Sequence, residues 1–282
     1  MIDKKIIDLN EFAKEKSPEY IHAKPFPHIV IDNLFDASFI SDVSKEFPKS
    51  EIDKEVKQRN NFQVKKFAIQ NESNFGPNTL SLFNYLNSQT WLRFLNKITS
   101  IEEKLFSDPY YIGGGLHGTI KGGWLKIHSD FKKHPDSDLD RRLNIIIFLN
   151  ETWDESYGGY LELWDRKLKT CIKKIPPIIN KTVIFNTSDY SNHGHPDPLT
   201  CPENMTRKSI AIYYYTNGRP IEDIDYKLRQ DGIKTYWKPR KNFLIDKQDF
   251  NLKFSLYHFF IEILRKILPQ TFFRLMFSKN KS

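Results

Sequence analysis

The chain reads Trp124-Leu125-Lys126-Ile127-His128-Ser129-Asp130 near its middle, where an apolar stretch ends in two residues that can bind a metal. On a β-strand successive side chains point to opposite faces, so His128 and Asp130 project from the same side. A second histidine, His193, follows further along the chain. Two neutral imidazoles and one carboxylate on one face of a metal leave the opposite positions open, as in non-haem Fe(II) enzymes that activate oxygen. The stretch therefore predicts a metal site formed by His128, Asp130 and His193.

The residues alone leave two points open. A His-x-Asp pair often occurs by chance, and more often marks a surface strand or a hydrogen-bonded pair than a metal site. The third ligand is also ambiguous, because Asn192-His193-Gly194-His195-Pro196 offers two imidazoles. His195 precedes a proline, which biases it toward an extended or turn geometry. It is interpreted as a loop residue or as part of the pocket mouth.

Further apolar runs indicate a protein made mainly of β-strands with flanking helices. Residues 142–150 form a β-branched run, which predicts a strongly buried strand. Further strands are predicted from shorter runs at residues 158–165, 182–186 and 208–216. Gly122-Gly123 predicts a hairpin turn that feeds the strand ending at His128. Many short strands at this spacing are typical of a barrel or a double-sheet jelly roll, and helical spacing at 39–47 and 91–106 predicts helices that buttress one sheet.

Short motifs follow one another in this order between residues 25 and 216: Pro25-Phe26-Pro27-His28-Ile29-Val30-Ile31-Asp32-Asn33, His128 with Asp130, Phe148-Leu149-Asn150, Gly158-Gly159, Ser191-Asn192-His193-Gly194 and Arg207-Lys208-Ser209-Ile210-Ala211. Together they resemble the iron(II)- and 2-oxoglutarate-dependent dioxygenase superfamily, in particular its prolyl-4-hydroxylase-like branch. The resemblance implies a double-stranded β-helix (jelly-roll) core in which His128, Asp130 and His193 bind Fe(II). It favours His193 over His195 by motif position, and implies that Arg207 binds the distal carboxylate of 2-oxoglutarate.

The chemistry of arginine supports that role for Arg207, because a guanidinium pairs with a carboxylate through two parallel hydrogen bonds where lysine offers a point charge. An ordinary solvated arginine at a strand end is the alternative. Many prolyl hydroxylases add a tyrosine hydroxyl to this subsite, and here Phe148 stands in its place and cannot donate. Asn144 and Thr119 are the predicted cosubstrate-binding residues beside Arg207, with Tyr111 as a further candidate. An asparagine satisfied by its neighbours is an alternative for Asn144.

The resemblance implies that 2-oxoglutarate is oxidised to succinate and carbon dioxide while molecular oxygen hydroxylates an unactivated C–H bond. Related halogenases replace the carboxylate ligand with a small residue, so the retained Asp130 favours hydroxylation. The expected substrate is a prolyl residue in a protein or peptide, or a related small molecule or glycan, with ascorbate as a reductant. The alternative is a non-catalytic jelly roll that binds a metal or a partner, because fold alone does not fix function.

The whole chain has 282 residues, which suggests one elaborated domain with appendages. The expected division is an N-terminal segment at 1–106, the oxygenase core at 107–220 and a C-terminal helical extension at 221–282. Apolar residues with basic flanks at 251–277 predict two short helices that pack on the core, or contact a partner or a membrane surface. Residues 54–66 predict a polar loop, interpreted as a solvated surface loop or as a loop over the mouth of the site. Residues 132–140 predict another polar loop, in a position to contact substrate.

The net charge and the number of cysteines indicate which classes of partner and which cellular compartment to expect. The formal net charge of +8 comes without a nucleic-acid motif, so no nucleic-acid partner is expected, although a positive field would help to attract a dianionic cosubstrate. Only two cysteines occur, Cys171 and Cys201, and both are expected to be free thiols. With no signal peptide or membrane-spanning run recognised, a cytoplasmic protein is expected.

Overall fold

The computed structural model describes residues 1–48, 62–225, 234–241, 243 and 246. The α-helices in this part of the chain are α1 (Leu9–His22), α2 (Ala37–Lys45), α4 (Pro77–Leu86) and α5 (Gln89–Thr99). The strands are β1 (His28–Asp32), β2 (Gln63–Ile69), β3 (Phe106–Ser107), β4 (Gly115–Ser129), β5 (Asp140–Phe148), β6 (Leu161–Trp164), β7 (Cys171–Ile175), β8 (Lys181–Asn186), β9 (His193–His195), β10 (Thr206–Thr216) and β11 (Tyr236–Trp237).

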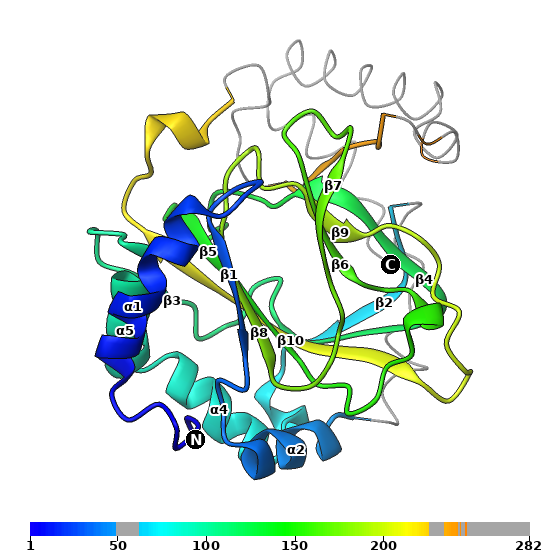
Figure 1. The fold of residues 1–282 in the computed structure, drawn as a ribbon, viewed down its shortest axis with the longest axis horizontal. Coiled ribbons are helices and arrows are strands. Elements are labelled where there is room, and N and C mark those ends of the chain that lie inside the picture. Colours follow the sequence, from blue (N-terminus) through cyan, green and yellow to red (C-terminus); the bar gives the residue numbers. More distant parts are fainter. Residues whose placement is uncertain (49–61, 226–233, 242, 244–245, 247–282) are drawn as a thin grey trace, which may run out of the picture. The chain divides into compact units, whose positions relative to one another are not determined.

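The strands form one curled, mainly antiparallel sheet with the order β1-β8-β5-β10-β4-β9-β6-β7 (Figure 1). Strands β2 and β11 pair with β4, and β3 pairs with β10. The predicted mainly β, jelly-roll-like core with flanking helices is confirmed. The strands predicted from the runs at 142–150, 158–165, 182–186 and 208–216 correspond to β5, β6, β8 and β10.

Strand β5 is buried on both faces: one face packs in the hydrophobic core and the other lines the cavity. Ile145 and Ile147 belong to the main hydrophobic core, which also contains residues of α1, α4 and α5. Asn144 and Ile146, on the opposite face, line the cavity enclosed by the sheet. Because side chains alternate along a strand, one β-branched run supplies both the packing against the helices and one wall of the cavity.

Gly122-Gly123 does not form the predicted hairpin. β4 continues in one direction through it, because β2 pairs antiparallel with both halves of β4, from Gln63 opposite Leu125 to Ile69 opposite Leu116. The register shifts between Val64 and Lys66, so that β4 bulges at this point. Gly122 has a φ of 73°, and a Cβ on Gly123 would come within 2.7 Å of Thr119 Cγ2. The bulge thus brings Thr119 close to the second half of the strand.

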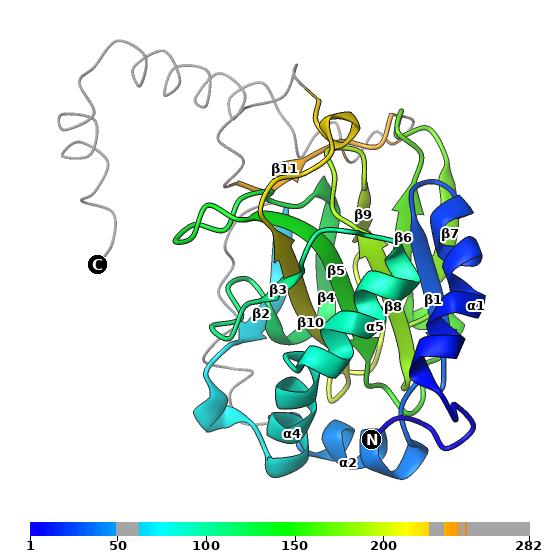
Figure 2. The ribbon, with the colours of Figure 1, turned by 90° about the vertical axis from the view of Figure 1, so that its left-hand side faces the viewer.

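The helices lie outside the sheet. Helix α1 packs against α5 and β1, and α2 packs against α4 (Figure 2). The predicted helix at 39–47 is α2, whereas α1 and α4 were not predicted. The predicted helix at 91–106 is too long, because α5 ends at Thr99 and Ser100 takes a left-handed conformation with a φ of 56°. Ile101 and Leu105 are still buried in the main core, which explains the apolar pattern that continues beyond the helix.

Trp91 anchors α5 to the sheet. Its side chain is fully buried, and its Nε1 donates to the Tyr214 hydroxyl at 2.8 Å. We expect Trp91→Ala to lower the free energy of unfolding by about 3–5 kcal/mol, because it leaves a large cavity. Trp91→Phe removes the hydrogen bond but keeps most of the volume, and should cost only about 1–2 kcal/mol. Urea denaturation of both variants checks this, and equal losses would contradict the role of volume.

The chain consists of two compact units, residues 1–238 and residues 239–282. The expected boundaries after residues 106 and 220 remain predictions. The helices expected at 251–277 lie outside the described residues, as do residues 54–61 of the expected polar loop. Residues 63–66 of that loop belong instead to β2. Within the described residues, no helix is long and apolar enough to cross a membrane, and Cys171 and Cys201 are free thiols.

Candidate active site

His128, Asp130 and His193 converge at one point inside the sheet. His128 lies near the end of β4, Asp130 directly follows that strand, and His193 faces His128 from β9. His128 Nε2 lies 3.5 Å from Asp130 Oδ1, and His193 Nε2 lies 3.5 Å from Asp130 Oδ2. One potential ligand atom from each residue falls within 4.8 Å of the others. The predicted trio is therefore brought together in a geometry that can hold one metal ion.

Backbone carbonyls fix the orientation of both imidazoles. His128 Nδ1 lies 2.9 Å from the carbonyl oxygen of Lys126, and His193 Nδ1 lies 2.9 Å from that of Ser191. A carbonyl only accepts, so each Nδ1 carries the proton and each Nε2 keeps a lone pair for a metal. Burial, with the neighbouring His128, lowers the pKa of His193 to about 4. His193 is therefore neutral near pH 7, as a metal ligand must be.

Two donors hold the Asp130 carboxylate. Arg141 Nη2 donates to Asp130 Oδ2 at 3.0 Å, and Asn144 Nδ2 donates to the same oxygen at 2.9 Å. Burial by itself would raise the pKa of Asp130, but Arg141 and the two histidines outweigh it and hold that pKa well below its usual value. The Arg141 guanidinium is itself packed between the rings of Phe131 and Tyr213. The carboxylate is therefore ionised and held in place.

The three residues open onto a cavity of ≈ 300 Å³. Arg207, on β10, also lines it and is only 5% exposed. Its Nε donates to the Gly159 carbonyl at 2.6 Å, and its guanidinium lies 5.0 Å from the centre of the Phe148 ring. No acidic side chain of the described residues pairs with Arg207, and burial lowers its pKa to about 9. A buried guanidinium without a carboxylate partner is suited to bind an anionic ligand.

Comparison with known proteins places this site in a family. Residues 115–215 match the 2OG-Fe(II) oxygenase superfamily, and this segment contains the three candidate metal ligands and Arg207. This match supports a 2OG-Fe(II) oxygenase over residues 115–215. The donor set fits its metal, since two imidazoles and a carboxylate are the ligands of non-haem Fe(II) oxygenases. Arg207, which pairs with no acidic side chain of the described residues, fits a dicarboxylate such as 2-oxoglutarate.

Individual relatives carry prolyl hydroxylase names. Prolyl 3-hydroxylase OGFOD1 of Mus musculus is 34% identical over 86 residues, which are 29% of this chain and 15% of that protein. The chain thus spans only a small part of this curated relative. A prolyl-4-hydroxylase of Pseudomonas putida aligns with a TM-score of 0.52 and 12% identity, over 75% of this chain and 100% of that one. A Trichoplax adhaerens prolyl hydroxylase, solved with a hypoxia inducible factor peptide fragment, aligns with a TM-score of 0.54 and 14% identity, over 77% and 94% of the two chains. These two structures share the fold of this chain.

The other residues predicted for the cosubstrate lie in two places. Thr119 is the register partner of Arg207 on the neighbouring strand, but it is not among the residues that line the cavity. Asn144 donates to Asp130 and so lies at the metal end of the cavity. Contact of Thr119 and Asn144 with 2-oxoglutarate remains a prediction. Tyr111 donates to Glu72 at 3.0 Å and is not among the residues that line the cavity.

Several residues of this oxygenase site were not predicted from the sequence. Arg141 looks like an ordinary charged residue at the start of a strand. Lys66 and His117 line the cavity from β2 and β4, with Lys66 Nζ 3.3 Å from His117 Nδ1. Trp237, on β11, lies with its ring centre 5.0 Å from that of His128. β2 and β11 carry no strong periodic signal, so only the pairing of strands reveals these contributions.

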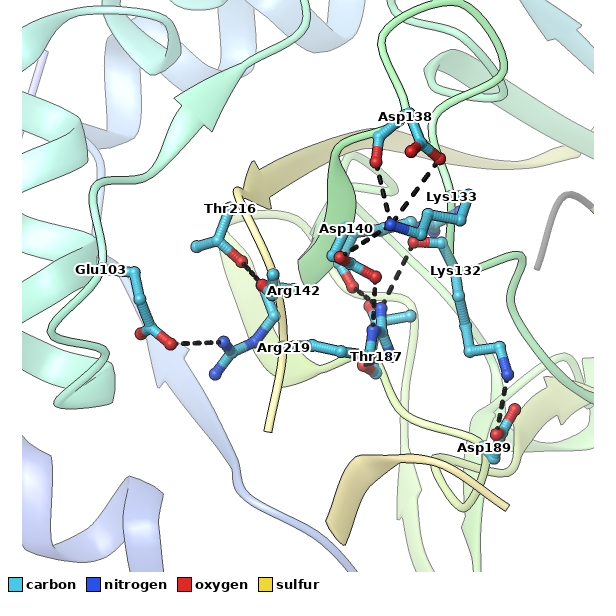
Figure 3. Close-up of polar contacts among 12 residues, drawn as sticks. Glu103, Lys132, Lys133, Asp138, Asp140, Arg142, Thr187, Asp189, Thr216 and Arg219 are labelled. Carbon is cyan, nitrogen blue, oxygen red and sulfur yellow. Dashed lines mark hydrogen bonds and ion pairs between the residues drawn. The ribbon is translucent and has the colours of Figure 1, made fainter. Parts of the chain in front are cut away.

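The polar loop at 132–140, which follows the metal strand, is tied down by ion pairs (Figure 3). Lys132 Nζ lies 2.8 Å from Asp189 Oδ2, and Lys133 Nζ lies 3.0 Å from Asp140 Oδ2. Arg219 Nε donates to Asp140 Oδ1 at 2.9 Å. These contacts join Lys132 to Asp189, which follows β8, and join both Lys133 and Arg219 to Asp140 at the start of β5, the strand that carries Arg141. A contact between this loop and substrate remains a prediction.

Proposed function

We propose that this protein is an Fe(II)- and 2-oxoglutarate-dependent dioxygenase that hydroxylates an unactivated C–H bond. The observation that carries the proposal is one cavity lined by the candidate ligands His128, Asp130 and His193 and by Arg207. Arg207 is buried and pairs with no acidic side chain in the described part of the chain. Bound Fe(II) and 2-oxoglutarate would together supply the oxidising power: one oxygen atom of O₂ enters the succinate, the other enters the substrate hydroxyl, and carbon dioxide is released.

The chain's own residues orient and shield this chemistry. The carbonyls of Lys126 and Ser191 keep the two Nε2 atoms available, and Arg141 with Asn144 keeps the Asp130 carboxylate ionised and directed. Arg207 holds the far end of the dicarboxylate, so that its 2-oxo acid end faces the three ligands. The site is buried, which excludes water and strengthens each of these electrostatic contacts.

A prolyl residue in a protein or peptide is the substrate that we propose. Support comes from the prolyl hydroxylase names of the relatives, one of which was solved with a peptide fragment. Related small molecules and glycans are the other outcomes of a substrate search. Ascorbate as reductant and a cytoplasmic location belong to the same proposal, because a ferrous metal and the two free thiols suit a reducing compartment.

Anaerobic titration with Fe(II) and then 2-oxoglutarate tests the proposal. We expect a weak visible charge-transfer band from chelation of the metal by the 2-oxo acid, followed by succinate formation when oxygen and a proline-containing peptide library are added. A folded protein without the band would overturn the proposed cofactor site. The band without peptide-dependent succinate would overturn the prolyl substrate, and without succinate for any substrate class it would favour the non-catalytic binding role.

A further inference from the structure

His195 lines the same cavity as the candidate metal ligands. It is two residues beyond His193 on β9, so both side chains project from the same face of that strand. Both line the cavity, and His195 is only 3% exposed. At about 3.3 Å per residue, the two positions are separated by roughly 6.6 Å along the strand. This separation is comparable to the length of a five-carbon dicarboxylate.

The protein makes little use of the polar atoms of His195. Its Nε2 lies 3.5 Å from Thr119 Oγ1, which is the outer limit of a hydrogen bond. Its Nδ1 is buried and has no hydrogen-bond partner among the described residues. A buried polar group left without a partner costs about 1–3 kcal/mol. Nε2 makes only its marginal contact with Thr119 within the described residues, so it is the ring atom available to donate to a ligand beside Thr119, the register partner of Arg207.

The neighbours of His195 define the charge of that ligand. Thr119 stands opposite Arg207 in the register of β4 and β10, and the β4 bulge brings Thr119 toward the half of that strand that pairs with His195. The guanidinium of Arg207 and the imidazole of His195 both line the cavity, and the Thr119 hydroxyl lies next to that imidazole. All three can donate hydrogen bonds, and none of the described acidic side chains pairs with Arg207. The combination favours a carboxylate.

We propose that His195 Nε2–H donates a hydrogen bond to the distal carboxylate of 2-oxoglutarate, beside Arg207 and Thr119. This inference rests on the proposed function. It gives His195 a binding role in place of the loop role expected from the proline that follows it. It also supplies a donor to the cosubstrate subsite, where Phe148 offers only its ring to Arg207.

The test compares two ligands that differ only at the far end. 2-Oxovalerate has the same chain length as 2-oxoglutarate and the same 2-oxo acid group, but a methyl group replaces the distal carboxylate. Dissociation constants for both are measured anaerobically from the charge-transfer band of the Fe(II) protein. His195→Leu removes the donor, His195→Gln keeps an N–H donor, and His22→Leu, at an exposed position in α1, is the control.

We expect His195→Leu to weaken 2-oxoglutarate about tenfold and leave 2-oxovalerate unchanged, with His195→Gln recovering part of the loss. A parallel weakening of both ligands would overturn the inference, because it would show that His195 only shapes the cavity. Unchanged affinity for both would overturn it as well, because water would then satisfy the imidazole. Failure of the proposed function looks different: the wild-type protein would form no charge-transfer complex with either 2-oxo acid.

Discussion

Asp130→Ala should abolish both Fe(II) binding and succinate formation. Asp130 is the one carboxylate among the three candidate ligands, and the variant leaves only two imidazoles to hold the ion. Replacing residues that merely support a metal ligand costs about 10–100-fold in metal affinity, so the loss of a ligand should exceed about 100-fold. Metal affinity is measured by anaerobic titration with Fe(II), and Asp136→Ala, at an exposed position in the adjacent loop, is the matched control.

Asp130→Ala also leaves a buried positive charge unpaired, and the resulting loss of stability must be distinguished from the loss of metal binding. Without Asp130, the fully buried Arg141 loses its ion-pair partner, and breaking such a pair on one side costs about 3–5 kcal/mol. The double variant Asp130→Ala, Arg141→Met removes both charges and should recover most of the stability while it still fails to bind Fe(II). If the double variant bound Fe(II) as tightly as the wild type, Asp130 would not be a metal ligand.

The clustering of the candidate metal ligands was predictable because its evidence is local. The alternation of side chains along a strand places His128 and Asp130 on the same side. The β-branched residues of β5 predict a buried strand. The resemblance added His193 and Arg207 through motif order. Each of these conclusions needs only the chemistry of a short segment and its place in the sequence.

The supporting residues were not predictable, because their roles depend on strand register and loop course. Arg141 reaches Asp130 only because the loop between them returns, and Trp237 reaches His128 only because two residues pair with β4. Glycine pairs mark bulges as well as turns, so Gly122-Gly123 was wrongly predicted to form a hairpin. The helix at 91–106 was drawn too long because burial continues after Thr99, where the backbone leaves the helix.

Arg207→Met should remove most of the affinity for 2-oxoglutarate and leave Fe(II) binding intact. Arg207 is the buried cation that lines the cavity without an acidic partner in the described chain, so it is available to a ligand carboxylate. Hydrogen bonds to charged groups contribute about 1.5–3 kcal/mol each, so losing a two-pronged contact should raise the dissociation constant by at least about 100-fold. Arg207→Lys keeps the positive charge but cannot form two parallel hydrogen bonds to a carboxylate. Its affinity for 2-oxoglutarate should therefore lie between that of the wild type and that of Arg207→Met. Affinities follow from the charge-transfer band, with Arg93→Met, at an exposed position in α5, as control.

Stability distinguishes a binding role for Arg207 from a structural one. Burial lowers the pKa of Arg207 to about 9, which means that the folded protein disfavours its charged form. Against this stand a hydrogen bond from Nε to the Gly159 carbonyl and a contact of the guanidinium with the Phe148 ring. A residue kept for binding at the expense of stability should therefore be replaceable without lowering the free energy of unfolding. We expect Arg207→Met to unfold in urea at the wild-type concentration or above it. A large loss of stability in parallel with the loss of 2-oxoglutarate affinity would instead make Arg207 part of the scaffold, and the cosubstrate carboxylate would need another partner.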